Sequence, residues 1–277
     1  VTSFDPNGNW VWGWSGENGE RGCSVLEPTF RPNGNLAIAG YISTPTDFDP
    51  GPGTTLVDAG RRLAGYKAHF TSTGALVEAV AWTNVEPTDG AADAQGFREA
   101  ADGAEWVIGS YSGAVDLDPG PGTALETVDL FADHIYLSHF ASNDTLTWHG
   151  TFDNQGAANT GPYLDGMAVD STGGLVVAGY VPNGQSADLD PAAGTSLVTG
   201  TTLYGEAFWT RLTPAGASDW VRHQPYNSFP AQFAILPSNR LLFYYSSFIY
   251  PQAFDTTHTL ALTGSPVLVS LQSDGTW

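Results

Sequence analysis

The sequence has one cysteine, Cys23, one lysine, Lys67, and no long apolar run. A single cysteine excludes an internal disulfide and a metal site built from several thiolates. The lack of an apolar run of about 18 residues excludes a membrane-spanning helix. The chain must therefore be stabilised by packing or by cations with oxygen ligands.

Positive charge is also scarce, because 9 Lys and Arg residues face 29 Asp and Glu residues for a formal net charge of −20. A nucleic-acid partner is excluded, since binding it requires a basic surface. The negative field favours cations or basic partners, and it also fits life in a saline habitat. With 42% hydrophobic and 12% aromatic residues in 277, the chain can fill a core, so intrinsic disorder is excluded.

An internal repeat is the most informative feature of the sequence. A turn residue followed by an apolar run occurs four times, with steps of 69, 70 and 66 residues between successive copies. The equivalent turn residues are Gly34, Gly103, Gly173 and Asn239.

A second marker follows the same period. An aromatic or leucine precedes a glycine by four residues in the pairs Phe4 and Gly8, Phe70 and Gly74, Leu212 and Gly216, and Leu271 and Gly275, with Phe140 and Asp144 as a variant. Eight residues after the apolar position stand Trp12, Trp148 and Trp220, and Glu78 is the exception. A periodic aromatic of this kind indicates packing between repeats.

The sequence of each repeat predicts β-structure. Short runs rich in Val, Ile, Tyr, Phe and Trp alternate with Asn-Gly, Asp-Gly and Pro-Gly turn signals, and helical periodicity is absent. In the first full repeat the predicted strands are about 25–30, 36–42, 66–71 and 75–82. Four antiparallel strands per repeat, arranged radially, predict an all-β protein with the blades of a β-propeller.

The expected organisation is one propeller domain over residues 1–277, with four blades. We expect full blades at about 25–83, 97–151 and 165–223, and a last blade at 232–277 that residues 1–15 complete by strand closure between the termini. Because the N-terminus also supplies an extra third strand, two alternatives remain. The chain belongs to a longer array, or end strands are exchanged between molecules in self-association.

The segment 168–180, which reads AVDSTGGLVVAGY, resembles the bacterial β-propeller repeat of the SBBP type. The resemblance covers nearly the whole chain and implies a propeller fold and a secreted or cell-surface location in a bacterium, but no catalytic residues. The last repeat departs from the pattern, because Asn239 replaces a glycine and the acidic loop of the other repeats is shortened.

The acidic loops, which read DFDPGPGT, DLDPGPGT and DLDPAAGT, suggest calcium as a cofactor. Two carboxylates at i and i+2, followed by a tight turn, supply the oxygen ligands that Ca²⁺ prefers. The alternative is that the aspartates only close the turn through hydrogen bonds to the backbone. The candidate ligands are Asp47, Asp49, Asp116, Asp118, Asp188 and Asp190.

In an up-and-down blade, the loop between the second and third strands lies on the same side as the connection to the next blade. This geometry predicts one acidic, loop-rich face for ligand contact. The candidate glycan- or protein-binding residues there are Tyr163, Tyr226, Phe229, Glu86, Asp89 and Asp153.

Catalytic motifs are absent from the sequence. No nucleophile elbow, phosphate loop or His-Glu-x-x-His spacing occurs, so no catalytic residue is proposed. The paired carboxylates repeat from one unit to the next, whereas a catalytic site breaks such symmetry. We therefore expect a non-catalytic binding or adhesion module for a glycan or protein ligand. The alternatives are a glycan-active enzyme with one asymmetric acidic site and a structural unit that assembles into filaments or arrays.

Overall fold

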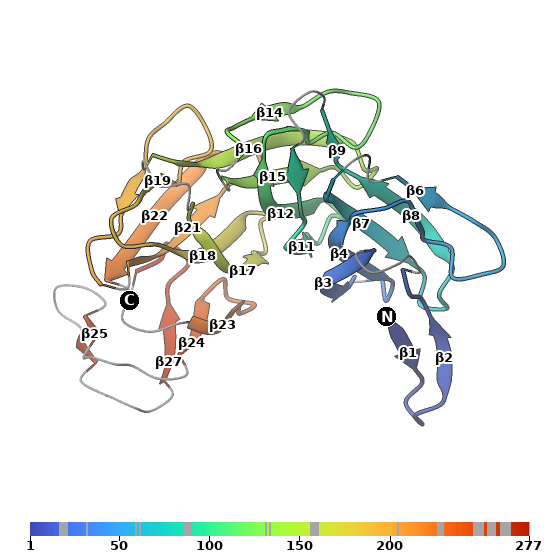
Figure 1. Ribbon diagram of the computed structural model, residues 1–277. Coiled ribbons are helices and arrows are strands. Elements are labelled where there is room, and N and C mark those ends of the chain that lie inside the picture. The colour runs from blue at the N-terminus through green and yellow to red at the C-terminus, as the bar shows by residue number, and fades with distance from the viewer. Residues whose placement is uncertain are drawn as a thin grey trace. The chain divides into compact units, whose positions relative to one another are not determined.

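A computed structural model gives the fold of the chain (Figure 1). It describes all residues except 17–21, 32, 59, 61, 86–89, 131, 133, 156–160, 204, 226–229, 246–251, 254–258, 261–266 and 277. The described residues form strands and loops without a helix, so the all-β prediction is confirmed. The strands lie in several sheets, and none of these sheets closes into a barrel.

The chain forms two compact units. The first comprises residues 1–99 and 105–149, and the second comprises residues 100–104 and 150–277. The single propeller domain expected from the sequence stays a prediction.

Repeat 1, in the first unit, is an antiparallel sheet in the order β3-β4-β7-β8 (Figure 1). Its strands are β3 (Cys23–Phe30), β4 (Leu36–Ile42), β7 (Ala64–Phe70) and β8 (Leu76–Ala81). They agree closely with the strands expected from the sequence. A hairpin of β5 (Thr46–Asp47) and β6 (Leu56–Val57) carries the first acidic loop.

Repeat 2 has the same plan, in the order β11-β12-β15-β16. Its strands are β11 (Gly96–Glu99), β12 (Glu105–Ser112), β15 (His134–Phe140) and β16 (Leu146–Asn154), and β16 runs from the first unit into the second. Its acidic hairpin is β13 (Ala114–Asp116) with β14 (Leu125–Thr127). Two short strands precede the repeat: β9 (Thr83–Asn84), which pairs with β13, and β10 (Ala91–Ala92), which pairs with β12.

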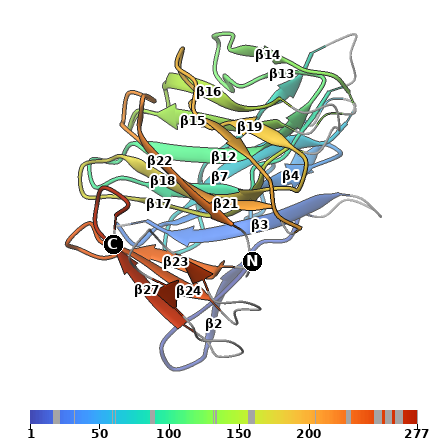
Figure 2. The same cartoon turned by 90° about the vertical axis from the view of Figure 1, so that its left-hand side faces the viewer.

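Repeat 3 lies in the second unit and has the order β17-β18-β21-β22 (Figure 2). Its strands are β17 (Tyr163–Val169), β18 (Leu175–Val181), β21 (Glu206–Leu212) and β22 (Ser218–Pro225), with the acidic hairpin β19 (Ser186–Asp188) and β20 (Leu197–Thr199). Repeat 4 has β23 (Pro230–Ile235), β24 (Leu241–Tyr245) and β27 (Val267–Leu271), with the hairpin β25 (Gln252–Ala253) and β26 (Thr259–Leu260).

The N-terminal hairpin is formed by β1 (Thr2–Phe4) and β2 (Trp10–Gly13), which pair with each other. Its sequence corresponds to the third and fourth strands of a repeat. Repeat 4 supplies strands one to three. The expected closure between these ends stays a prediction.

The repeat period is visible in the backbone as well as in the sequence. The turn after the first strand has positive φ at Gly34, Gly103, Gly173 and Asn239, which is why glycine or asparagine recurs there. The turn after the third strand also has positive φ, at Gly8, Gly74, Asp144, Gly216 and Gly275. The two markers identified from the sequence are therefore two left-handed turn positions.

Candidate functional site

The first aspartate of each acidic loop closes its hairpin by accepting two backbone hydrogen bonds. Asp47 Oδ1 accepts from the amides of Asp49 (3.0 Å) and Thr55 (2.8 Å). Asp116 Oδ1 does the same in repeat 2, and Asp188 Oδ1 in repeat 3, with partners at the same two spacings. This aspartate therefore bridges the two sides of the loop.

The second aspartate organises the turn itself. Asp49, Asp118 and Asp190 each accept a hydrogen bond through Oδ1 from the amide two residues later, at 2.7, 2.8 and 3.1 Å. Their Oδ2 atoms lie against Gly53, Gly122 and Gly194, where a Cβ would collide with the carboxylate. This close approach explains the glycine that precedes the final threonine of the motif in all three loops.

These contacts account for the Oδ1 atoms through hydrogen bonds to the backbone, which is the turn interpretation. They use one oxygen of each carboxylate, so calcium binding by the six aspartates stays a prediction. Within the described residues, the one group of potential ligand atoms that lie within 4.8 Å of one another contains none of the six.

Apolar residues in the hairpins point in two directions. The residue between the two aspartates, Phe48, Leu117 or Leu189, is fully buried and anchors the loop. The leucine paired across the hairpin from the first aspartate is exposed instead. Leu56, Leu125 and Leu197 expose 61%, 50% and 54% of their surface. Sequence reasoning missed these leucines, although their fixed spacing from the aspartates was visible.

The strand that leaves one repeat lies beside the acidic hairpin of the next. Thr83 pairs with Asp116, and Asp153 pairs with Asp188. The predicted binding residue Asp153 is therefore brought next to a predicted calcium ligand. This agrees with the expected placement of loops and connections on one side of a repeat.

Of the other predicted binding residues, Tyr163 is exposed and stacks on Tyr180, with ring centroids 5.0 Å apart. Glu86, Asp89, Tyr226 and Phe229 lie outside the described residues.

Tryptophans link neighbouring repeats. Trp12 is buried and stacks on Phe70, and Trp220 is buried against Leu271 and Val269. Trp12 and Trp220 thus have the packing role expected for the periodic tryptophans, whereas Trp148 is half-buried and packs on Trp106 of its own repeat, with ring centroids 5.8 Å apart. Two residues after Trp12, Trp14 donates its indole N–H to the Asp47 carbonyl at 3.0 Å.

Trp82, directly after the fourth strand of repeat 1, donates its indole N–H to the Leu117 carbonyl at 3.1 Å. Each acidic hairpin in the first unit is thus fastened by the preceding fourth strand. Sequence reasoning did not single out Trp14 and Trp82, because they stand at different distances from the third-strand marker and give no periodic signal.

A groove of about 580 Å³ lies in the first unit, beside the outer strand of repeat 1. Its lining combines an indole, threonine hydroxyls and two acidic side chains. The residues that line it are Trp12, 49–51, Thr55 and 73–79.

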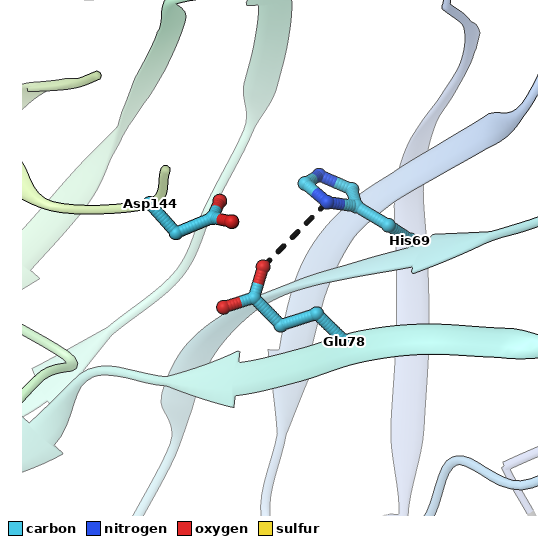
Figure 3. A group of neighbouring side chains, drawn as sticks. All are labelled: His69, Glu78 and Asp144. Atoms are coloured by element: carbon cyan, nitrogen blue, oxygen red, sulfur yellow. Dashed lines mark ion pairs between the residues drawn. The ribbon is translucent and has the colours of Figure 1, made fainter. Parts of the chain in front are cut away.

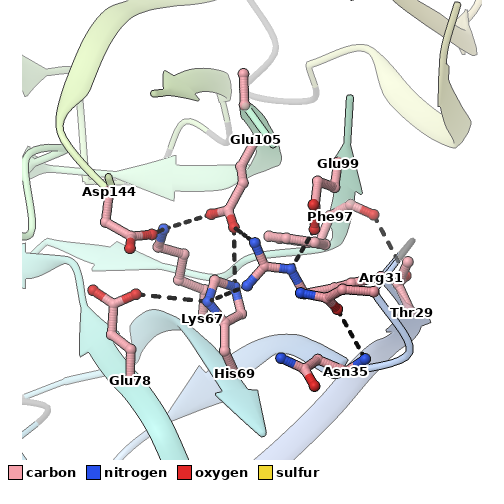
Figure 4. A network of polar contacts seen from close by, with 12 residues as sticks. Thr29, Arg31, Asn35, Lys67, His69, Glu78, Phe97, Glu99, Glu105 and Asp144 are labelled. Carbon is pink, nitrogen blue, oxygen red and sulfur yellow. Dashed lines mark hydrogen bonds and ion pairs between the residues drawn. The ribbon is translucent and has the colours of Figure 1, made fainter. Parts of the chain in front are cut away.

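A cluster of charged side chains lies between repeats 1 and 2 (Figure 4). Lys67 Nζ lies 2.7 Å from both Glu105 Oε2 and Asp144 Oδ1. Arg31 forms ion pairs with Glu99 and, at 3.2 Å, with Glu105. We call this group the ionic cluster, and its members are Arg31, Lys67, His69, Glu78, Glu99, Glu105 and Asp144.

Burial separates the protonation states of the cluster. Burial, helped by the charges of Lys67 and Arg31, lowers the pKa of His69 to about 3, so its ring is neutral. Its Nδ1 then accepts the hydrogen bond from Arg31 Nη1 at 3.1 Å. Although burial alone would lower it, the charge of Glu105 and the hydrogen bonds to Asp144 and Glu105 raise the pKa of Lys67. Lys67 therefore stays charged.

The two carboxyl groups of Glu78 and Asp144 have opposite shifts. Burial, together with the charge and hydrogen bond of Asp144, raises the pKa of Glu78 to about 7 against the opposing charge of Lys67. Burial acts to raise the pKa of Asp144 as well, but the hydrogen bond and charge of Lys67 outweigh it and lower that pKa. Below neutral pH the pair therefore holds a proton on Glu78.

His69, Glu78 and Asp144 were also considered as a metal centre. One potential ligand atom of each lies within 4.8 Å of the others, and their side chains converge in Figure 3. However, Arg31 already donates to His69 Nδ1, and Lys67 already donates to Asp144. A metal ion would have to displace or face two positive charges, so we assign no metal to this group.

Comparisons with known proteins assign the chain to no family. No family model and no curated protein matches the chain. A crystal structure of a protein of unknown function from Bacteroides caccae is similar, with 13% sequence identity and a TM-score of 0.44 over 98% of this chain and 70% of that chain.

Among the described residues, no helix is long and apolar enough to cross a membrane.

Proposed function

We propose that the protein is a non-catalytic binding or adhesion module whose acidic hairpins contact a protein ligand. The observation that carries the proposal is the exposed leucine at the same place in three hairpins. Leu56, Leu125 and Leu197 each lie across from a turn-closing aspartate, while the loop is already anchored by a buried neighbour. The exposed leucines are therefore available to a partner.

The chemistry of the hairpins indicates what the partner offers. Each leucine is flanked by carboxylates in a chain with a formal net charge of −20. A partner with apolar side chains between basic residues complements this surface, because opposite charge speeds association and apolar contact supplies affinity. A protein or peptide fits this description better than a neutral glycan. The stack of the exposed Tyr163 on the half-buried Tyr180 keeps a glycan ligand as the alternative.

We further propose that the four repeats are the blades of one propeller, with residues 10–14 completing the last blade. The proposal rests on three sheets with the same strand order and on an N-terminal hairpin that corresponds to strands three and four. The expected secreted or cell-surface location and calcium in the acidic loops belong to the same proposal.

The enzymatic alternative has less support. The acidic hairpins repeat, and the asymmetric ionic cluster is occupied by its own ion pairs. A glycan-active enzyme would need a carboxyl pair that faces a substrate cleft.

The test is selection of peptides from a random displayed library on the immobilised full chain. We expect basic, apolar peptides whose binding weakens as salt increases. The triple variant Leu56→Ser, Leu125→Ser, Leu197→Ser should lose this binding. The matched control is Leu203→Ser, which changes an exposed leucine outside the hairpins and should bind normally. Binding that survives the triple substitution, or a glycan array that yields the only ligand, would contradict the proposal.

A further inference from the structure

The contact between repeats 1 and 2 differs chemically from the other contacts of its kind. Trp12 packs on Phe70 and over Gly74, and Trp220 packs over Gly275. The equivalent positions in repeats 1 and 2 hold Glu78 and Asp144, and a carboxyl oxygen of each lies within 4.8 Å of the other. A polar pair thus replaces an indole packed over glycine.

The replacement extends to the neighbouring strands. Lys67 stands where repeats 2 and 3 have Leu137 and Trp209, and it reaches both Asp144 and Glu105. Glu105 stands where repeats 1, 3 and 4 have a leucine. Four departures from the repeat pattern, far apart in sequence, therefore meet in the ionic cluster.

The charges that surround Glu78 leave no partner for a further negative charge. Lys67 and His69 face it from β7, Asp144 from the turn between β15 and β16, and Glu105 from β12; Arg31 and Glu99 complete the cluster behind them. The two cations, Arg31 and Lys67, are already bonded to Glu99, Glu105 and Asp144. Glu78 Oε2 is buried without a hydrogen-bond partner. A charge on Glu78 would be placed against Asp144 and beside the neutral ring of His69, whose Nδ1 lies 3.6 Å away, and the charge of Lys67 would offset it only in part.

We infer that a proton on Glu78 holds repeats 1 and 2 together, and that the contact loosens when this proton leaves above neutral pH. The side chains of Glu78 and Asp144 are 26% and 37% exposed, so the proton exchanges with solvent without unfolding of the chain. Lys67 and Glu105 stay paired beneath them, which limits the loosening to the outer strand β8 and the turn between β15 and β16.

The direction of the pH dependence follows from linkage. The ordinary pKa of a glutamate is 4.5, and that of Glu78 in the folded chain is raised to about 7. The folded state therefore binds more protons than the unfolded state between these values, and this contribution to stability falls as pH rises through that window. The expected change in the unfolding equilibrium constant is roughly tenfold to a hundredfold.

The experiment compares wild type with Glu78→Gln, which keeps the shape of the protonated side chain and cannot ionise. Amide hydrogen exchange of the full chain is measured at about pH 5 and about pH 8.5, on either side of the transition. Comparing the two proteins at the same pH removes the intrinsic pH dependence of exchange. We expect equal protection at the lower pH and faster exchange in wild-type β8 and residues 141–145 at the higher pH.

Glu126→Gln is the matched control, because Glu126 is another partly buried glutamate of the first unit, bonded to His149 at 3.1 Å. It should leave the pH response of β8 unchanged. A titration of labelled Glu78 by carboxyl-carbon NMR keeps the inference testable if Glu78→Gln does not fold. A titration midpoint near 4.5, or equal exchange in wild type and Glu78→Gln at both pH values, would overturn it.

Discussion

Lys67 and Glu105 form an ion pair of 2.7 Å in which the two side chains are only 1% and 2% exposed. The sole lysine of a strongly acidic chain is thus placed inside the protein rather than on its surface. The Lys67 ammonium also lies 4.4 Å from the centre of the Phe140 ring. Lys67 therefore joins repeats 1 and 2 through both charge and packing.

Removing the Lys67 ammonium should lower the free energy of unfolding. Lys67→Met leaves Glu105 and Asp144 without their shared cation, and breaking a buried pair on one side typically costs about 3–5 kcal/mol. Denaturant unfolding of the first unit should show a loss of this size.

The double variant Lys67→Leu, Glu105→Leu is the control, since it restores the residue types of the other repeats. Replacing a whole buried pair by apolar residues is often neutral. We expect it to recover part of the loss, because Asp144 and Arg31 keep other partners. A double variant less stable than Lys67→Met would contradict this account of the pair.

The first aspartate of an acidic loop should matter for stability through its acceptor oxygen. Asp47→Ala removes the acceptor for the amides of Asp49 and Thr55, and a loss of about 1–3 kcal/mol is expected. Asp47→Asn keeps an acceptor oxygen and should cost much less. Chemical denaturation of both variants measures the difference. Equal losses would show that the negative charge matters rather than the turn.

Calcium gives a separate prediction for the same loops. If the aspartates bind Ca²⁺, EDTA should lower the thermal midpoint and added Ca²⁺ should restore it, with about 2.7 kcal/mol of stabilisation at a hundredfold excess over Kd. Mg²⁺ at constant ionic strength is the control. An unchanged midpoint would leave the loops as turns closed by hydrogen bonds.

The indole of Trp82 should contribute through both volume and hydrogen bonding. Trp82 is fully buried and donates to the Leu117 carbonyl, so Trp82→Phe should cost about 1–3 kcal/mol and Trp82→Ala about 3–5 kcal/mol. Trp10→Phe, at a position 64% exposed, should change stability by less than about 0.5 kcal/mol. Unfolding followed by circular dichroism tests all three, and a cost for Trp10→Phe equal to that of Trp82→Phe would contradict the assignment.

The repeated part of the fold was predictable because it depends on local chemistry. Positive φ at Gly34, Gly103 and Gly173 requires a residue type that can be read from the sequence. The alternation of strands and turns follows from it. The expected pairing between the N-terminal and C-terminal strands does not follow from local chemistry in this way, since it depends on which distant strands pair.

The ionic cluster shows why the candidate site was harder to predict. Glu78 and Asp144 were recognised as departures from the pattern, but each departure taken alone has no evident purpose. Their relationship appears only when the strands place residues 66 positions apart at one contact. Lys67 and Glu105 also depart from the repeat pattern, since apolar residues stand at their positions in the other repeats, but sequence reasoning missed both. The turn role of Asp47 was open in the sequence, because the same spacing serves a cation or a backbone amide.

The contact between Glu78 and Asp144 also bears on the history of the chain. Repeats that arise by duplication begin as interchangeable copies, and any copy can follow any other. Once one boundary has exchanged its indole and glycine for two carboxyl groups and a lysine, that freedom is lost. Repeat 1, moved to precede another repeat, would carry Lys67 away from Glu105 and Asp144 and would leave a buried cation without its two acidic partners. The contact between the first two repeats is thus specific to their order, and exchanging that order would lower the free energy of unfolding.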